Sequence, residues 1–170
     1  MQQRLTIEIH EKDISILEKF DIGTEIYYRK SRNMIAKAIS SDKICNDLQN
    51  YGIIQNKTFK LKFPKNIDDN NIHHFIRGVF DGDGWFTVGK KGYLRSGFVG
   101  CKEFLEELQK VLPCQSHLRV PKNKNYATVT MHQKETLKFI DFIYENATIF
   151  LHRKRNIVAS FKSLQGDTIQ

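Results

Sequence analysis

The sequence predicts an α+β protein made of two related halves, in which antiparallel strands are covered by helices on one face. Three observations support this prediction. Segments of alternating apolar and polar residues indicate half-buried strands, and segments with apolar residues at helical spacing lie between them. The order strand, helix, basic hairpin, helix also recurs along the chain, although few residues are identical between the two passes. We therefore expect a first half at residues 1–66 and a second half at residues 67–170.

The first half begins with residues 5–9, where strict alternation predicts a strand. Apolar residues at helical spacing then predict a helix from Ile14 to Phe20 that closes at Gly23. A basic hairpin is expected next, followed by a helix that starts at residues 40–42 and ends at Gly52.

The second half repeats this order with two additional elements. It begins with a helix at about residues 70–83, followed by a strand that starts at Trp85. The later elements are a turn at 90–92, a helix at 104–112, a hairpin joining 117–120 to 126–130, a helix at 137–144 and a basic helical tail at 149–161. The first half lacks the opening helix and strand, so its strand at residues 5–9 is expected to present an unpaired edge.

Charge and composition limit the classes to which this protein can belong. The chain has 27 Lys and Arg against 19 Asp and Glu, a formal net charge of +8. Such a charge fits either binding to a polyanion or a basic surface that is merely solvated, and composition alone does not separate the two. The three cysteines, Cys45, Cys101 and Cys114, form no CxxC pair and fit a reducing interior. No apolar run approaches the roughly 18–20 residues that a bilayer span needs. We therefore expect an intracellular protein with no membrane partner.

The segment at residues 75–84 carries the most information. Gly78 and Gly82 lie one turn apart, on the same helix face as His74. Glycine inside a helix costs about 1 kcal/mol relative to alanine, so two of them need a reason. Close approach of a second helix is one, because small residues spaced four apart let two helix backbones meet. We therefore expect His74, Gly78 and Gly82 to form a helix–helix interface.

The end of the same helix suggests a metal site. Asp68 or Asp69 can cap its start, and Gly84 can end it. Asp83 is then left at the C-terminus, where a carboxylate opposes the helix dipole unless a cation is near. A carboxylate beside carbonyl oxygens is a ligand set that Mg²⁺ prefers.

The run Ile76-Arg77-Gly78-Val79-Phe80-Asp81-Gly82-Asp83-Gly84 closely resembles the signature helix of the LAGLIDADG homing endonucleases, with Arg77 where a small residue is commoner. Further segments also resemble that family: residues 57–58 with Pro64, residues 151–154, and the two basic hairpins. The resemblance implies two antiparallel sheets that form a saddle, with paired signature helices at its centre. It also implies a site-specific enzyme that cuts both strands of DNA, and therefore an intracellular, DNA-associated protein.

The resemblance assigns roles to four residues. Asp83 is implied as the metal-binding acid, with the Gly82 carbonyl as a second ligand. Lys154, and Lys57 as its counterpart in the first half, are implied as assisting catalytic lysines; either could instead serve in structural ion pairs. Two or more Mg²⁺ ions are implied for each active assembly, and they would supply the activated water and stabilise the leaving oxygen.

The hairpins are expected to read double-stranded DNA, since a two-stranded ribbon fits the major groove. Alternation assigns one set of side chains to the DNA face and the other to the core. The residues expected on or near that face are Thr87, Lys91, Arg95, Arg119, Thr128, Thr130 and His132. The residues expected at phosphates are Lys122, Lys124, Lys30 and Arg32. Trp85 is open to either of two roles, base stacking or filling a core or groove wall.

One feature departs from the family pattern. Two acidic helix ends are needed, and only Asp83 is found. A homodimer, or a second chain carrying the signature helix, would supply the other acid. Three alternatives remain open: an inactive fragment, a DNA-binding or intron-splicing protein on the same scaffold, and an interaction fragment that uses the unpaired strand edge.

Overall fold

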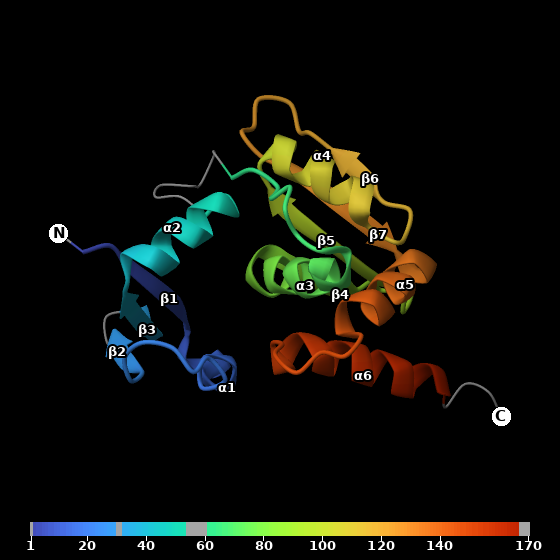
Figure 1. Ribbon diagram of the computed structural model, residues 1–170. Helices are drawn as coiled ribbons and strands as arrows, with labels where there is room; N and C mark the ends of the chain where they lie inside the picture. Colours follow the sequence, from blue (N-terminus) through green and yellow to red (C-terminus); the bar gives the residue numbers. More distant parts are fainter. Residues whose placement is uncertain (1, 30–31, 54–60, 167–170) are drawn as a thin grey trace.

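The computed structural model describes residues 2–29, 32–53 and 61–166 (Figure 1). Its first half contains one three-stranded antiparallel sheet, ordered β1-β3-β2. The elements of this half are β1 (Arg4–His10), η1 (Glu11–Asp13), α1 (Ile14–Leu17), β2 (Tyr27–Arg29), β3 (Met34–Ser40) and α2 (Asp42–Asn50). The strand predicted at residues 5–9 and the helix predicted to start at residues 40–42 are thereby confirmed, with the Ser41 hydroxyl accepting the Ile44 N–H.

The second half contains a four-stranded antiparallel sheet, ordered β4-β5-β7-β6. Its elements are η4 (Asp69–Asn71), α3 (Ile72–Asp83), β4 (Gly84–Val88), β5 (Leu94–Gly100), α4 (Lys102–Val111), β6 (His117–Arg119), β7 (Ala127–His132), α5 (Gln133–Tyr144) and α6 (His152–Gly166). Each predicted hairpin and helix of this half is found.

The two sheets share one topology. The order β1-β3-β2 matches β5-β7-β6, with a helix between the first two strands of each set in sequence and another after the last. This correspondence confirms the prediction of two related halves. In the second half α3 and β4 come before this common unit, and the described part of the first half has no equivalent of them. The boundary at residues 66 and 67 stays a prediction.

The helix predicted up to Phe20 is shorter than expected. α1 ends at Leu17, because the chain then turns to run beside β3. The Thr24 N–H donates to the Ala38 carbonyl at 2.8 Å. Gly23 has φ +70°, and a Cβ there would lie 2.1 Å from that same carbonyl oxygen. The tight approach to β3 therefore requires glycine, and it ends the helix early.

Helices cover one face of each sheet. In the second half, alternate residues of β5 and β7 point into a core against α3, α4 and α5. The fully buried residues at its centre are Ile76, Phe80, Phe98, Leu105, Leu108, Val129, Met131, Phe139 and Ile143. α6 packs beside this core through Val158 and Phe161. No helix in the described ranges has the length and apolar character to cross a bilayer.

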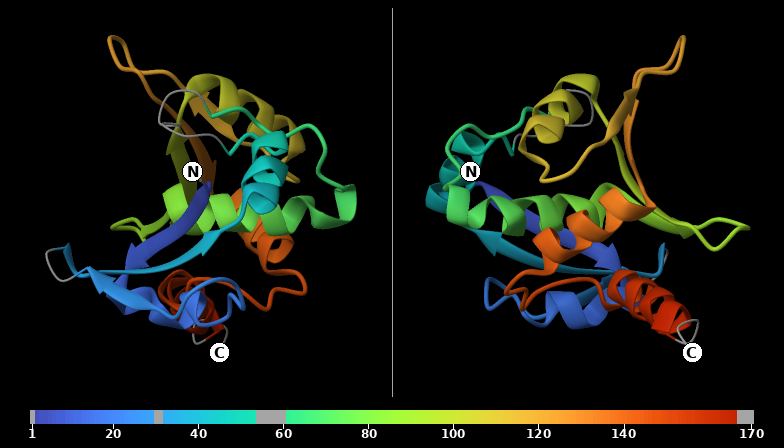
Figure 2. Two further views of the ribbon diagram at one scale, coloured as in Figure 1. Left: turned by 60° about the vertical axis from the view of Figure 1, so that its left-hand side comes forward. Right: turned by 90° about the vertical axis from the view of Figure 1, so that its right-hand side faces the viewer.

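The two halves lie on either side of a central opening, with β1 and α1 facing α3 across it (Figures 1 and 2). Two polar contacts join the halves at one end. The Lys19 ammonium donates to the Thr148 carbonyl at 2.6 Å, and Arg153 pairs with Asp13 at 3.1 Å.

Replacement of Phe80 by alanine tests the second-half core. The Phe80 ring lies 4.7 Å from that of Phe86, 5.3 Å from Phe98 and 5.1 Å from Phe139, measured between centroids. We expect Phe80→Ala to lower the free energy of unfolding by about 3–5 kcal/mol in urea titration. The exposed control Val88→Ala is expected to stay within about 0.5 kcal/mol of the wild type. Equal losses in the two variants would contradict this description of the core.

Candidate nucleic-acid interface and catalytic centre

α3 carries the signature run and has its start and end fixed by neighbouring residues. The Asp68 carboxylate accepts the Asn70 N–H at 2.8 Å, so Asp68 caps the turn that leads into the helix. Ile76 and Phe80 are fully buried on the core side. At the other end, a Cβ on Gly84 would lie 2.2 Å from the Phe80 ring, so only glycine lets the helix pass directly into β4.

Lys154 of α6 binds the end of α3. Its ammonium donates to the carbonyls of Phe80, Asp81 (3.0 Å) and Gly84 (2.6 Å), and the side chain is buried. These are carbonyls that the end of a helix leaves without partners. Burial lowers the pKa of Lys154 to about 8, while Asp81 and Asp83 favour the charged form. Lys154 therefore holds the helix end as a cation at neutral pH; its catalytic role stays a prediction.

The two acids at this helix end are in different environments. Asp81 is buried, and its Oδ2 accepts the Leu151 N–H at 3.1 Å. Burial raises the pKa of Asp81, and its Oδ1 has no hydrogen-bond partner among the described residues. Asp83 and Gly82 are exposed at the edge of the central opening. Asp81 thus joins the helix to the segment before α6, and Asp83 faces solvent.

The donors near Asp83 fit a magnesium ion that also uses water and substrate. The Asp83 carboxylate is exposed, and the Gly82 carbonyl is not one of the three that Lys154 binds. Residues 2–29, 32–53 and 61–166 contain no group of three or more His, Cys, Asp or Glu side chains placed to hold a metal. Mg²⁺ commonly binds through one or two carboxylates together with substrate phosphates, so this donor set suits it.

Arg77 ties α3 to the end of α5 and to the segment that follows it. Its guanidinium donates to the carbonyls of Ile149 (2.8 Å) and Ile143 (3.0 Å) and lies 2.8 Å from Nδ1 of His74. An arginine can only donate, so His74 Nδ1 accepts and the ring carries its proton on Nε2. Burial lowers the pKa of His74, and the charges of His73 and Arg77 lower it further. Arg77, which stands where the signature run more commonly has a small residue, therefore has hydrogen-bond partners within the fold.

One face of the second sheet gathers the side chains predicted to read DNA. The cross-strand rows place Thr87 beside Arg95, and Arg95 beside His132. The next rows bring Thr130 and Thr128 into the same face, with Arg119 at its edge. Arg95, Thr128, Thr130 and His132 alternate with buried core residues along β5 and β7. Thr87 and Arg119 follow partly buried residues in β4 and β6. The structure thus brings them together on the face opposite the helices.

Two further residues lie on this face: Trp85, for which base stacking was one of two expected roles, and His117, which the sequence did not single out. Trp85 lies over Gly97, because a Cβ on that glycine would be 2.6 Å from the indole. It is half-buried on the outer face, so it does not enter the core. His117 pairs with Thr130, and its ring lies 5.6 Å from that of His132. The alternation of His117 with Leu118 was the signal that could have placed it.

The other residues predicted to contact DNA lie in turns and loops. Lys91 is exposed in the β4–β5 turn, and Lys122 and Lys124 are exposed in the connection between β6 and β7. Both loops project away from the helices (Figure 2). Arg32 is exposed in the turn before β3. The predicted Lys30 and Lys57 lie outside the described residues.

Comparison with solved structures finds one recurring fold. The I-LtrWI LAGLIDADG homing endonuclease bound to target DNA matches with TM-score 0.63 and 16% identity, over 95% of this chain and 78% of that one. The meganuclease I-AabMI bound to uncleaved DNA matches with TM-score 0.66 and 15% identity, over 96% and 81%. I-SmaMI bound to an uncleaved DNA target with calcium ions matches with TM-score 0.67 and 13% identity, over 97% and 81%.

The chain has the LAGLIDADG homing-endonuclease fold. The resemblance seen in the signature run is therefore confirmed for the architecture, including the saddle of two antiparallel sheets. No protein-family model matches the sequence.

Removal of the Lys154 ammonium tests its hold on α3. We expect Lys154→Met to lower the free energy of unfolding by about 2–4 kcal/mol, because three carbonyls lose their donor. Lys138→Met is the matched control, since Lys138 is exposed and pairs at the surface with Glu135. Its expected loss in the same urea titration is below about 1 kcal/mol. A Lys154→Met variant with the same free energy of unfolding as the wild type would show that these contacts contribute little to stability.

The neutral form of His74 should make stability depend on pH. Below about pH 6.5 the unfolded chain protonates His74, whereas the folded chain resists it, so stability falls as the pH is lowered. His74→Gln keeps an acceptor and cannot take up that proton. We expect the free energy of unfolding to fall less steeply between about pH 7 and pH 5 in His74→Gln than in the wild type. Parallel curves would contradict the lowered pKa.

Proposed function

We propose that this protein is a site-specific DNA endonuclease that cuts both strands of double-stranded DNA with divalent metal at the end of α3. The observation that carries the proposal is the exposed Asp83 beside the Gly82 carbonyl, at the centre of a LAGLIDADG saddle. The solved structures with this fold include complexes with target, cleaved and uncleaved DNA. DNA lying across the saddle would pass beside Asp83.

The sheet face supplies the recognition in this proposal. Thr87, Arg95, Arg119, Thr128, Thr130 and His132 would contact base edges, together with Trp85 and His117. A guanidinium such as that of Arg95 can bind guanine through two hydrogen bonds, and threonine can bond to several bases. Lys91, Lys122 and Lys124 at the projecting loops would bind phosphates and fix the register, as would Arg32 and Lys30. The net charge of +8 adds a salt-dependent attraction to the duplex.

The proposed catalytic centre combines residues of this chain with a bound metal ion. Mg²⁺, held by Asp83 and the Gly82 carbonyl, would supply an activated water and neutralise charge on the departing oxygen. Lys154 keeps the helix end in place, so the carboxylate meets the backbone of the DNA in a fixed position. Lys154 and Lys57 would also assist through their positive charge near the phosphate.

A complete centre needs a second acid. The assembly proposed here has two or more metal ions and two acidic helix ends, the second supplied by a homodimer or by another chain with the signature helix. We propose an intracellular site of action on DNA.

A second function deserves a test because the described residues hold one acidic helix end. The chain would then bind DNA, or RNA in intron splicing, without cutting. Both functions would use the same sheet face to bind nucleic acid. Only a cleavage assay therefore separates them.

Asp83→Asn separates catalysis from binding. The duplexes to test are selected by wild-type protein from a randomised library in calcium, then incubated with magnesium or with EDTA. We expect the variant to keep the wild-type melting temperature and DNA affinity, since Asp83 is exposed. Its cleavage rate should fall by about a thousandfold or more, because the metal supplies several kcal/mol of charge stabilisation.

Asp69→Asn is the matched control, because Asp69 is an exposed acid in η4, just before the start of α3. It is expected to cut at the wild-type rate. Cutting by Asp83→Asn would reject the assignment of the site. Salt-dependent binding by the wild type with no cutting in magnesium would select the DNA-binding alternative for this chain.

A further inference from the structure

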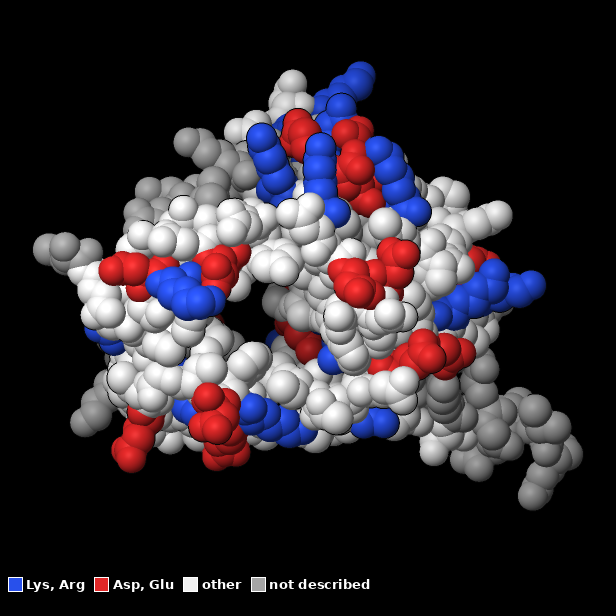
Figure 3. Space-filling model, in the orientation of Figure 1, with Lys and Arg blue, Asp and Glu red and all other residues white. Residues whose placement is uncertain are grey.

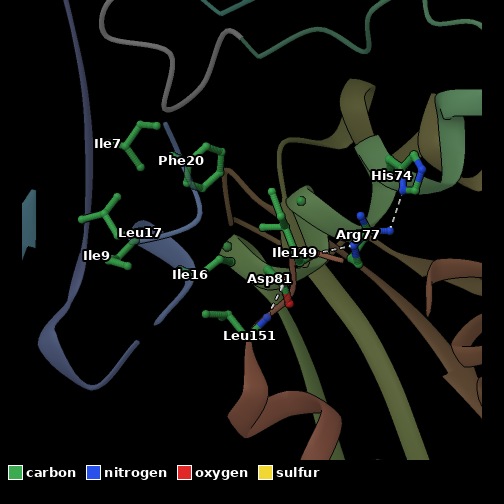
Figure 4. A pocket seen from close by; sticks show the side chains of 12 residues that line it. Ile7, Ile9, Ile16, Leu17, Phe20, His74, Arg77, Asp81, Ile149 and Leu151 are labelled. Atoms are coloured by element: carbon green, nitrogen blue, oxygen red, sulfur yellow. Dashed lines mark hydrogen bonds between the residues drawn. The ribbon is translucent and has the colours of Figure 1, made fainter. Parts of the chain in front are cut away.

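β1 carries different kinds of side chain on its two faces. Ile7 and Ile9 point into an open groove of ≈ 380 Å³ between β1 and α3, on the same side as Leu17 and Phe20 (Figure 4). Successive side chains of a strand point to opposite faces, so the residues between them face away from the helices. The residues that β1 presents on this outer face are Arg4, Thr6, Glu8 and His10.

The outer face of the first sheet corresponds to the face of the second sheet that gathers the predicted DNA-reading side chains. Arg4 lies opposite Ser40, the last residue of β3, and Arg95 lies opposite His132, the last residue of β7. Since β1 and β3 match β5 and β7 in the shared topology, the two arginines occupy equivalent places. In the proposed function both faces therefore lie toward the duplex.

An ion pair crosses β3 on the outer face of the first sheet. Glu8 of β1 is opposite Ala36 of β3, and Arg29 of β2 is opposite Met34 of the same strand. Nε of Arg29 lies 2.7 Å from Oε2 of Glu8. Both side chains are partly exposed, and no other described residue forms an ion pair or a side-chain hydrogen bond with either of them. As far as the described residues go, Oε1 of Glu8 and the two terminal nitrogens of Arg29 are therefore open to a ligand.

An acid is out of place on a face that meets DNA. Glu8 is the one Asp or Glu in any strand of the described ranges. On the helix side, by contrast, acids and cations are interspersed over α2 and α4 (Figure 3). A carboxylate that faces a duplex is repelled by the phosphates, so it is unfavourable there unless the DNA gives it a hydrogen-bond donor. Glu8 therefore needs a donor on a base.

A C·G base pair matches the atoms that this ion pair leaves open. In the major groove guanine presents two acceptors, N7 and O6, and the paired cytosine presents the donor N4 amino group. The terminal nitrogens of Arg29 suit the two acceptors, and Oε1 of Glu8 suits the amino group. Adenine has an amino donor where guanine has O6, so an A·T pair would set a donor against the donors of Arg29.

We propose that Glu8 and Arg29 together read one C·G base pair of the target. Arg29 binds N7 and O6 of the guanine through its terminal nitrogens. Glu8 holds the guanidinium through Nε, which orients that fork before binding, and accepts the N4 amino group of the cytosine. The inference rests on the proposed function for DNA as the ligand, and it does not require cleavage.

The test measures base preference without cutting. Duplexes are selected from a randomised library by the full chain in calcium and then sequenced. We expect the wild type to require a C·G pair at one position and to bind the other base pairs there about tenfold to a hundredfold more weakly. In Glu8→Gln and in Arg29→Lys this discrimination should fall by at least about fivefold, with the rest of the selected sequence unchanged.

A second measurement separates base reading from a structural role. Glu8→Gln should bind duplex of random sequence at least as tightly as the wild type does, because the change removes a negative charge from the DNA face. Loss of a purely structural ion pair would instead weaken binding to every duplex and lower the melting temperature. The variant that carries both changes should discriminate no worse than Arg29→Lys alone, since the two side chains act on one base pair.

Two variants away from this face serve as matched controls. Glu103→Gln changes an exposed acid of α4, and Arg155→Lys changes an exposed arginine of α6. Both should select the same sequence as the wild type with the same discrimination. The melting temperature of each variant is measured beside its base preference.

Each remaining outcome overturns the paired reading or supports it. The same C·G preference in the wild type, Glu8→Gln and Arg29→Lys would overturn it, and so would relaxation in Arg29→Lys alone. A wild type that enriches no duplex would reject DNA recognition altogether, and this proposal with it. Loss of the C·G preference in both variants, in a chain that cuts no DNA in magnesium, supports the paired reading and counts against the nuclease function.

Discussion

The contact between the Lys154 ammonium and the last carbonyls of α3 is the interaction on which the site depends. It joins the last described helix to the signature helix, across more than seventy residues of sequence. The carbonyls it takes are those that the helix itself cannot satisfy. With that end held, α3 can pass into β4 without a loop, and the residues at the junction keep a fixed position.

Local pattern was enough to predict most of the fold. Period-two alternation located β1 and β7, and helical spacing located α2 and α4, because each of these elements carries its apolar residues on one side. The one clear error, α1, arose where a distant contact outweighed local spacing. Phe20 follows the helical pattern, but the chain must turn early so that Gly23 can approach Ala38.

The site was less predictable, because its contacts are between distant segments. Alternation alone placed Thr128, Thr130 and His132 on one face, whereas His117 joins them through strand register. The signature spacing identified Asp83, but no local pattern indicates that Lys154 has all three N–H groups bonded to carbonyls. The carbonyls that Arg77 binds are likewise distant in sequence, at Ile143 in the last turn of α5 and at Ile149 beyond it.

Helix geometry explains why Asp81 and Asp83 are so different although one residue separates them. Two residues turn an α-helix by about 200°, so their side chains leave it on nearly opposite sides. Asp81 is thereby directed toward Leu151 and Lys154, and its charge is buried where nearby cations offset it. Asp83 is directed to the opening, beside the edge that Gly78 and Gly82 leave bare. The same rotation that makes one acid a structural tie leaves the next exposed, so the open groove and the proposed metal site belong to one surface.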